Sequence, residues 1–163
     1  MKFNKLMILA FVALGLSACQ KEYVKETIPG SELSGRWYVE YTVGGEDVYG
    51  VGHTTLLTYT TAAADGKEII VTDEDHFWSF KAKTPANPEG LSFGSTDSTT
   101  SLVDGYDIKM IVKNGMIIPG AGRSKTGVVT DSIYMVVGFA DDAPGAEYVV
   151  SGHRRTGFVE DEY

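Results

Sequence analysis

The chain has 163 residues, of which 43% are hydrophobic and 11% aromatic, and it carries 22 acidic against 14 basic side chains. The apolar content is enough for a folded core, which excludes a disordered chain, and the length corresponds to one domain. The negative charge excludes a nucleic-acid-binding function, because no basic patch offsets its repulsion from phosphates.

The first residues have the layout of a secretory signal peptide. Lys2 and Lys5 precede an apolar run of about ten residues, which is too short to span a bilayer as a helix. Residues 16–19 read Leu-Ser-Ala-Cys and resemble the lipobox of bacterial lipoproteins. We therefore expect residues 1–18 to be a lipoprotein signal peptide that is cleaved before Cys19, and we expect lipid on the Cys19 thiol.

Lipidation of Cys19 has consequences for the rest of the chain. It is the only cysteine, so the mature domain is expected to fold without a disulfide. Without residues 1–18 the chain has 12 basic and 22 acidic side chains, a net charge of −10. The polar stretch 19–30 ends in Pro-Gly and is interpreted as a flexible tether to the domain at 31–163. Gln20 does not resemble an inner-membrane retention signal, which predicts an outer-membrane anchor on either the periplasmic or the surface face.

From Ser34 onward the hydrophobic period is two, the period of β-strands. Trp37, Val39 and Tyr41 alternate with polar residues, and similar short runs follow at intervals as far as Thr156. Asn114-Gly115 stands between two such runs and predicts a β-hairpin. The mature chain shows no amphipathic helical segment. We predict an all-β, antiparallel barrel or sandwich of about eight or nine strands.

The first and last predicted strands carry a family signature. Gly35-Arg36-Trp37 and the arginine pair Arg154-Arg155 resemble the lipocalin and wider calycin pattern. The resemblance implies an up-and-down calycin/lipocalin-like β-barrel, in which Arg154 covers Trp37 and joins the first strand to the last. An arginine stacked on an indole contributes about 0.5–2 kcal/mol.

The mature chain also resembles the lipid-binding putative hydrolase family of Gram-negative envelope lipoproteins. The resemblance rests on residues 35–39, 77–80, 131–135 and 152–158. It implies a calycin-like fold and a lipid ligand, and it carries over no catalytic residues. The sequence departs from true lipocalins because it lacks their disulfides and has no helix after the last strand.

Candidate catalytic groups are scattered along the chain. His53, His76 and His153 could act as general bases beside Ser79, Ser132 or Ser151, oriented by Asp75 or Asp131. No G-x-S-x-G elbow is present, so the sequence assigns no catalytic residue. The cluster Asp73-Glu74-Asp75-His76 lacks the spacing of a calcium loop or a zinc motif, and it predicts a solvated turn. We expect no metal and no cofactor.

Several large apolar side chains fall on alternating strand positions and are candidates to line a ligand cavity: Tyr41, Tyr59, Trp78, Phe80, Met110 and Met135. The same residues could instead fill the barrel. The first hypothesis is a membrane-anchored protein whose barrel binds a lipid or another small apolar ligand. The alternatives are a hydrolase acting on an ester-like lipid, and a structural or interaction lipoprotein with a filled barrel and an unspecified protein partner.

Overall fold

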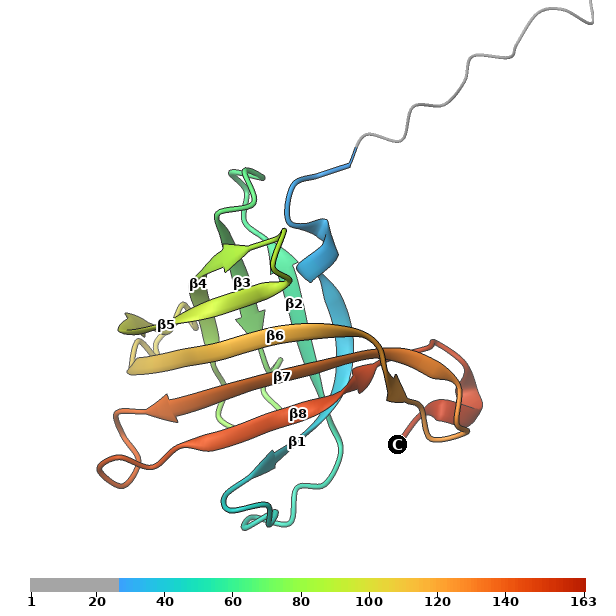
Figure 1. Ribbon diagram of the computed structural model, residues 1–163. Helices are drawn as coiled ribbons and strands as arrows, with labels where there is room; N and C mark the ends of the chain where they lie inside the picture. Colours follow the sequence, from blue (N-terminus) through green and yellow to red (C-terminus); the bar gives the residue numbers. More distant parts are fainter. Residues whose placement is uncertain (1–26) are drawn as a thin grey trace, which may run out of the picture.

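Eight antiparallel strands form a closed barrel in the computed structural model of the protein, which describes residues 27–163 (Figure 1). Each strand pairs with the next one in the chain, and β8 pairs with β1. The strands are β1 (Gly35–Thr42), β2 (Thr54–Thr60), β3 (Glu68–Thr72), β4 (Lys81–Asn87), β5 (Ser92–Thr100), β6 (Lys109–Arg123), β7 (Val129–Phe139) and β8 (Tyr148–Arg154). This topology confirms the predicted all-β, up-and-down calycin/lipocalin-like barrel.

Two short 3-10 helices flank the barrel. η1 (Ser31–Leu33) precedes β1, and η2 (Val159–Asp161) follows β8. Within residues 27–163 no helix has the length and apolar character needed to cross a membrane. The predicted signal peptide, Cys19 and most of the predicted tether lie outside the described residues.

The alternation of β1 places every second side chain in the barrel interior. Trp37, Val39 and Tyr41 are buried and belong to one continuous apolar cluster with inward residues of the other strands. Tyr38 points to the opposite face of the same strand. It is also buried, because the C-terminal Tyr163 packs edge-on against its ring at 4.9 Å. The C-terminal segment therefore covers part of the outer surface of β1.

The predicted hairpin at Asn114-Gly115 is wrong. β6 runs through both residues without turning back, and its pairing with β7 shifts register between Lys113 and Met116. Asn114 has a left-handed backbone with φ of 55°, which fits a β-bulge as well as it fits a turn. Gly115 is required at this point, because a Cβ there would lie 2.4 Å from the ring of Phe93 on β5. The glycine thus allows β5 to approach β6 closely.

The barrel has two different ends. The loops 43–53, 73–80, 101–108 and 140–147 connect successive strand pairs at one end, which we call the mouth. The opposite end, which we call the sealed end, carries η1, the turns after β2, β4 and β6, and the residues after β8. The described chain enters beside the sealed end, and the β1–β2 loop lies on the other side of the barrel (Figure 1).

Candidate functional site

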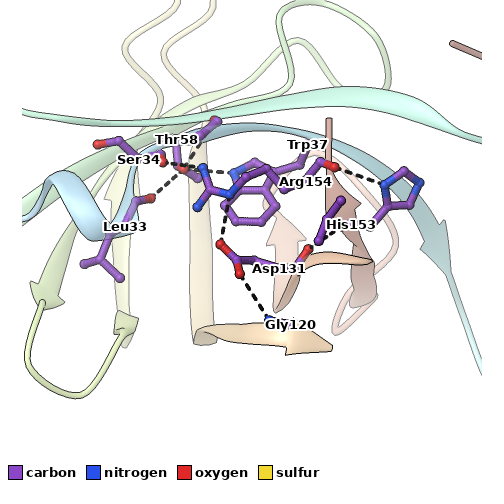
Figure 2. Close-up of polar contacts among 10 residues, drawn as sticks. Leu33, Ser34, Trp37, Thr58, Gly120, Asp131, His153 and Arg154 are labelled. Carbon is purple, nitrogen blue, oxygen red and sulfur yellow. Dashed lines mark hydrogen bonds and ion pairs between the residues drawn. The ribbon is translucent and has the colours of Figure 1, made fainter. Parts of the chain in front are cut away.

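The sealed end is closed by contacts around Trp37 (Figure 2). The guanidinium of Arg154 lies over the Trp37 ring, 4.3 Å from its centre, and donates a hydrogen bond of 2.8 Å to the carbonyl of Ser34. The indole N–H donates to the hydroxyl of Thr58 at 3.0 Å, and that hydroxyl donates to the carbonyl of Leu33 at 2.6 Å. The first, second and last strands and η1 are therefore joined through one buried tryptophan.

Asp131 on β7 completes this arrangement. Its carboxylate accepts hydrogen bonds from the Nε of Arg154 at 3.0 Å and from the backbone N–H of Gly120 at 3.1 Å (Figure 2). Gly35 leaves the space that the guanidinium occupies, because a Cβ at that position would lie 2.3 Å from Nη1 of Arg154. The glycine of the Gly-x-Trp pattern is thus a steric requirement of the stacking on Trp37. Trp37 and Arg154 close the barrel interior at this end, and the hollow of about 430 Å³ found here is formed by Pro29 and the turns after β2 and β4.

The mouth is organised by Asp73, the first residue of the β3–β4 loop 73–80, which we call the plug loop. Its carboxylate is fully buried and accepts hydrogen bonds of 2.7–3.2 Å from the backbone N–H groups of five loop residues, namely Asp75, Phe77, Trp78, Ser79 and Phe80. The prediction of a solvated turn is therefore wrong for Asp73, although Asp75 and His76 are exposed. The alternation of apolar and polar residues from Phe77 to Ala82 predicts a strand there, and this prediction is also wrong for residues 77–80, since β4 begins at Lys81.

The backbone of the plug loop is held in an unusual conformation. Glu74, Asp75 and Ser79 have φ values of 51°, 75° and 55°, in the left-handed region that residues with a Cβ rarely adopt. Such conformations persist only where the surrounding contacts impose them, and they concentrate at ligand clamps and switch regions. In this loop the contacts that impose them are the hydrogen bonds to Asp73.

The plug loop places two aromatic rings, Phe77 and Trp78, over the interior of the barrel, and we call this pair the aromatic plug. Phe77 stacks on Tyr41 of β1 with ring centres 4.0 Å apart and planes at 13°. Trp78 stacks on Phe139 of β7 with centres 4.9 Å apart and planes at 6°. Tyr148 of β8 packs edge-on against Phe77 at 5.2 Å. Both plug residues are only half-buried, so the mouth is covered by aromatic rings that solvent still reaches.

Tyr41 carries a polar atom that finds no protein partner beneath the plug. The side chain is 1% exposed, and its hydroxyl is one of two buried side-chain polar atoms without a hydrogen bond among the described residues. Burial, with a contribution from the nearby Asp73 carboxylate, raises the pKa of Tyr41 well above its ordinary value. A buried hydroxyl without a partner costs about 1–3 kcal/mol, and such groups are rare in native proteins.

A hollow of about 490 Å³ opens at the surface of the plug, lined by Asp75, Phe77, Trp78, Ser79 and Tyr106. Its aromatic walls are tied to Asp141 of the β7–β8 loop. The indole N–H of Trp78 donates to this carboxylate at 3.1 Å, and the hydroxyl of Tyr106 donates to its other oxygen. The hydrogen bonds from Tyr106 and Trp78 lower the pKa of Asp141, which therefore stays ionised beside the rings.

The charges of the mouth loops all have one sign. The four loops contain ten carboxylates and no lysine or arginine: Glu46, Asp47, Asp73, Glu74, Asp75, Asp104, Asp107, Asp141, Asp142 and Glu147. Two of them form ion pairs with strand residues, Glu74 with Arg36 at 3.0 Å and Glu147 with Lys113 at 2.6 Å. The remaining excess gives the mouth a negative potential.

The residues predicted to line a cavity separate into two groups. Tyr41, Phe80, Met110 and Met135 are buried in the apolar cluster, and Trp78 packs against it from the mouth. The side chain of Tyr59 points out of the barrel, because the neighbouring residue on β2, the buried Thr58, points inward. Of the six, Tyr41 and Trp78 contribute to the mouth. Four residues of the mouth could not be identified from the sequence, because their roles depend on a loop that folds inward: Phe77, Phe139, Tyr106 and Asp73.

The candidate hydrolytic groups do not form a nucleophile–base pair. Ser132 donates to the carbonyl of Gly152 at 2.8 Å, and Ser79 donates to Asp75. His153 contacts Tyr163 through Nε2 at 3.2 Å. Among the described residues, neither serine is hydrogen-bonded to a histidine, Asp131 is engaged by Arg154, and Ser151 is exposed on β8.

His76 comes nearest to such a pair, with Nδ1 lying 3.1 Å from the hydroxyl of Thr55. The same Nδ1 lies 2.7 Å from the carbonyl of Asp73, which can only accept, so Nδ1 carries the proton. It therefore cannot serve as the base for Thr55. Within residues 27–163 there is also no group of three or more histidine, aspartate or glutamate side chains placed to hold a metal ion.

Comparison with known protein families identifies the family to which the barrel belongs. A family model described as lipid-binding putative hydrolase matches residues 22–159, a span that includes all eight strands. No curated protein matches the chain. The match confirms the resemblance seen in the sequence and supports lipid binding by the barrel. The chain therefore belongs to the lipid-binding putative hydrolase family.

Proposed function

We propose that this protein is an envelope lipoprotein that binds an amphipathic lipid at the mouth of its barrel. The observation that carries the proposal is the aromatic plug, in which Phe77 and Trp78 cover the barrel interior under a loop held by Asp73. Ligand sites are mostly apolar and have a few placed polar groups, and the mouth combines both. The acyl chain of the ligand contacts the rings of the plug, and the head group stays among the polar atoms of the mouth loops.

The interior below the plug is occupied by side chains, so binding requires the plug loop to move. Val39, Leu56 and Met135 are among the fully buried residues that fill the described barrel. The plug itself is only half-buried and its loop has three left-handed residues, so its displacement releases strain. This release and the contacts with the ligand must offset the lost stacking and the lost hydrogen bonds to Asp73. The Tyr41 hydroxyl then becomes available to a polar group of the ligand.

The anchoring part of the proposal comes from the amino-acid sequence. Cys19 follows a lipobox-like sequence and is the expected attachment point, with the outer membrane as the expected location. The described chain begins beside the sealed end (Figure 1). Attachment at that side leaves the mouth directed away from the tether, free to receive a ligand from the aqueous side of the membrane.

The first test is to find what the protein carries. The chain from Gln20 to Tyr163 contains every strand of the closed barrel and lacks the lipidated cysteine. It is purified without detergent, extracted with organic solvent and examined by mass spectrometry. A stoichiometric lipid supports the proposal. A clean extract that also takes up no added fatty acid, fatty amine or fatty alcohol contradicts it and favours a filled barrel whose loops contact other proteins.

The second test locates the lipid within the barrel. The protein has two tryptophans, Trp37 at the sealed end and Trp78 in the plug. Lipid binding at the mouth is expected to change the emission of Trp78, so the signal persists in the Trp37→Phe variant and disappears in Trp78→Phe. A signal that follows Trp37 instead would place the ligand at the wrong end and contradict the proposed site.

A further inference from the structure

We propose that the mouth selects an amphiphile with a cationic ammonium head group and discriminates against fatty-acid anions. This inference rests on the proposed function and specifies the ligand class of the same site. It follows from three features of the mouth: aromatic walls, an ionised carboxylate behind them, and the absence of basic residues from the four mouth loops.

The hollow at the plug has the composition of an ammonium site. Its walls include the rings of Phe77, Trp78 and Tyr106, which come from two different loops. Aromatic faces attract a cation through the negative charge of their π-systems, and cages of such rings are the usual receptors for quaternary ammonium groups. The hollow, at about 490 Å³, is large enough for such a head group with part of its chain.

Asp141 strengthens this attraction. It accepts hydrogen bonds from both Trp78 and Tyr106, so it fixes the orientation of two wall rings and draws their positive edges toward itself. The carboxylate contributes a full negative charge beside the hollow. An ammonium group placed between the rings therefore meets the ring faces and the Asp75 carboxylate in the wall of the hollow, with the charge of Asp141 behind the rings.

The four mouth loops disfavour the opposite charge, and the nearest lysines, Lys81 and Lys109, lie at the start of the strands that follow two of them. A fatty-acid carboxylate is normally bound by lysine, arginine or free backbone N–H groups. The mouth loops contain no lysine or arginine, and five N–H groups of the plug loop already donate to Asp73. Repulsion from the surrounding carboxylates acts on any anion that approaches.

An independent observation lies beneath the plug. The hydroxyl of Tyr41 is buried and has no protein partner, and the ring that covers it is Phe77, which also lines the hollow. A ligand that displaces Phe77 reaches a hydroxyl whose oxygen accepts a hydrogen bond from a primary ammonium group and faces a quaternary one with its partial negative charge. When Phe77 alone is displaced, Trp78 and Tyr106 remain as the aromatic walls of the ammonium site, because both donate hydrogen bonds to Asp141.

The test compares three probes with the same hydrocarbon chain and different heads: dodecyltrimethylammonium, dodecanol and dodecanoate. Each is titrated below its micelle concentration into the Gln20–Tyr163 chain, with Trp78 emission and calorimetry as readouts. The cation is expected to bind at least about tenfold more tightly than the anion at low salt, with the alcohol between them. Added salt is expected to narrow this gap, because it screens the carboxylates.

Variants assign the preference to the mouth. Asp141→Asn is expected to lower the affinity for the cation and leave that for the alcohol nearly unchanged. Glu89→Gln, an exposed acid in the turn after β4 at the sealed end, makes the same change of charge and is the matched control. Equal binding of cation and anion, or tighter binding of dodecanoate, overturns the inference while the proposed function stands. Failure of all three probes to bind overturns the proposed function itself.

Discussion

The two ends of the barrel are closed in different ways. At the sealed end, side chains from β2, β7 and β8 are linked around Trp37 of β1, and Thr58 and Arg154 also donate hydrogen bonds to the segment before β1. At the mouth, one loop is held to one carboxylate, Asp73, and its aromatic residues are half-buried. Opening the sealed end would separate strands, whereas full opening of the mouth requires the plug loop to leave Asp73 and Trp78 to leave Asp141, with the strand pairing kept. The difference indicates which end is structural and which admits a ligand.

The largest effect is expected from Trp37→Ala. The substitution empties the centre of the sealed end and removes the ring beneath Arg154, so we expect a loss of about 3–5 kcal/mol in the free energy of unfolding. Urea denaturation followed by circular dichroism measures it. Lipid affinity at the mouth should change little wherever the variant is folded. A variant with near wild-type stability would show that the seal does not depend on the tryptophan.

The next effect is expected from Asp73→Asn. An amide cannot accept five hydrogen bonds as the carboxylate does, and we expect a loss of about 2–3 kcal/mol in unfolding free energy. Hydrogen exchange distinguishes this variant from Trp37→Ala. The amides of residues 75–80 should lose protection, while those of β1 and β8 keep theirs. Uniform loss of protection over the whole barrel would contradict the view that the plug loop opens separately.

A smaller effect is expected at Gly35→Ala. The new Cβ would lie 2.3 Å from Nη1 of Arg154, so the guanidinium must leave its position over Trp37 and lose its bond to Ser34. We expect a loss of about 1–2 kcal/mol, the sum of a cation–π contact and a hydrogen bond. Arg154→Lys should lose a similar amount, and the double variant should be little worse than either. Fully additive losses would show that the glycine acts elsewhere.

The sequence predicts the sealed end better than the mouth. The alternation around Trp37 and the Gly-x-Trp pattern are local signals. A hydrophobic period of two indicates a strand with one buried face, wherever that strand lies in the fold. The plug loop is different, because Asp73 is buried only when the amides that follow it wrap around its carboxylate. From the sequence alone, the acidic run Asp-Glu-Asp predicts a solvent-exposed turn, and the alternation from Phe77 to Phe80 predicts a strand.

Asn114-Gly115 shows the same limit. The left-handed backbone that the pair favours occurs both in a hairpin turn and in a bulge. What decides between them is the continuous pairing of β6 with β7 on both sides of the pair, a contact between distant parts of the chain. Local signals identify a residue with unusual backbone geometry, and tertiary pairing determines what that geometry is used for.

The smallest effect is expected at the edge of the sealed end, in Asp161→Asn. Asp161 is buried, and its carboxylate accepts hydrogen bonds from the N–H and hydroxyl of Thr126 and from the hydroxyl of Thr156. The hydrogen bonds from Thr126 and Thr156 hold the pKa of Asp161 well below its ordinary value of 3.8. An asparagine keeps one acceptor oxygen, so only part of this network is lost at neutral pH.

The pH dependence gives this last variant its sharpest test. A carboxyl group whose pKa is lower in the folded state stabilises the fold above its unfolded pKa, and this stabilisation is lost as the pH falls toward the folded value. The difference in melting temperature between the wild type and Asp161→Asn should therefore be constant near neutral pH. It should shrink below about pH 4. Lipid affinity, measured at neutral pH, should be the same in both proteins, because Thr126 and Thr156, the partners of Asp161, lie outside the four mouth loops. The C-terminal segment does contact one mouth loop, through the stacking of Tyr163 on His53 at 4.0 Å. A change in affinity would mean that the two ends of the barrel are coupled.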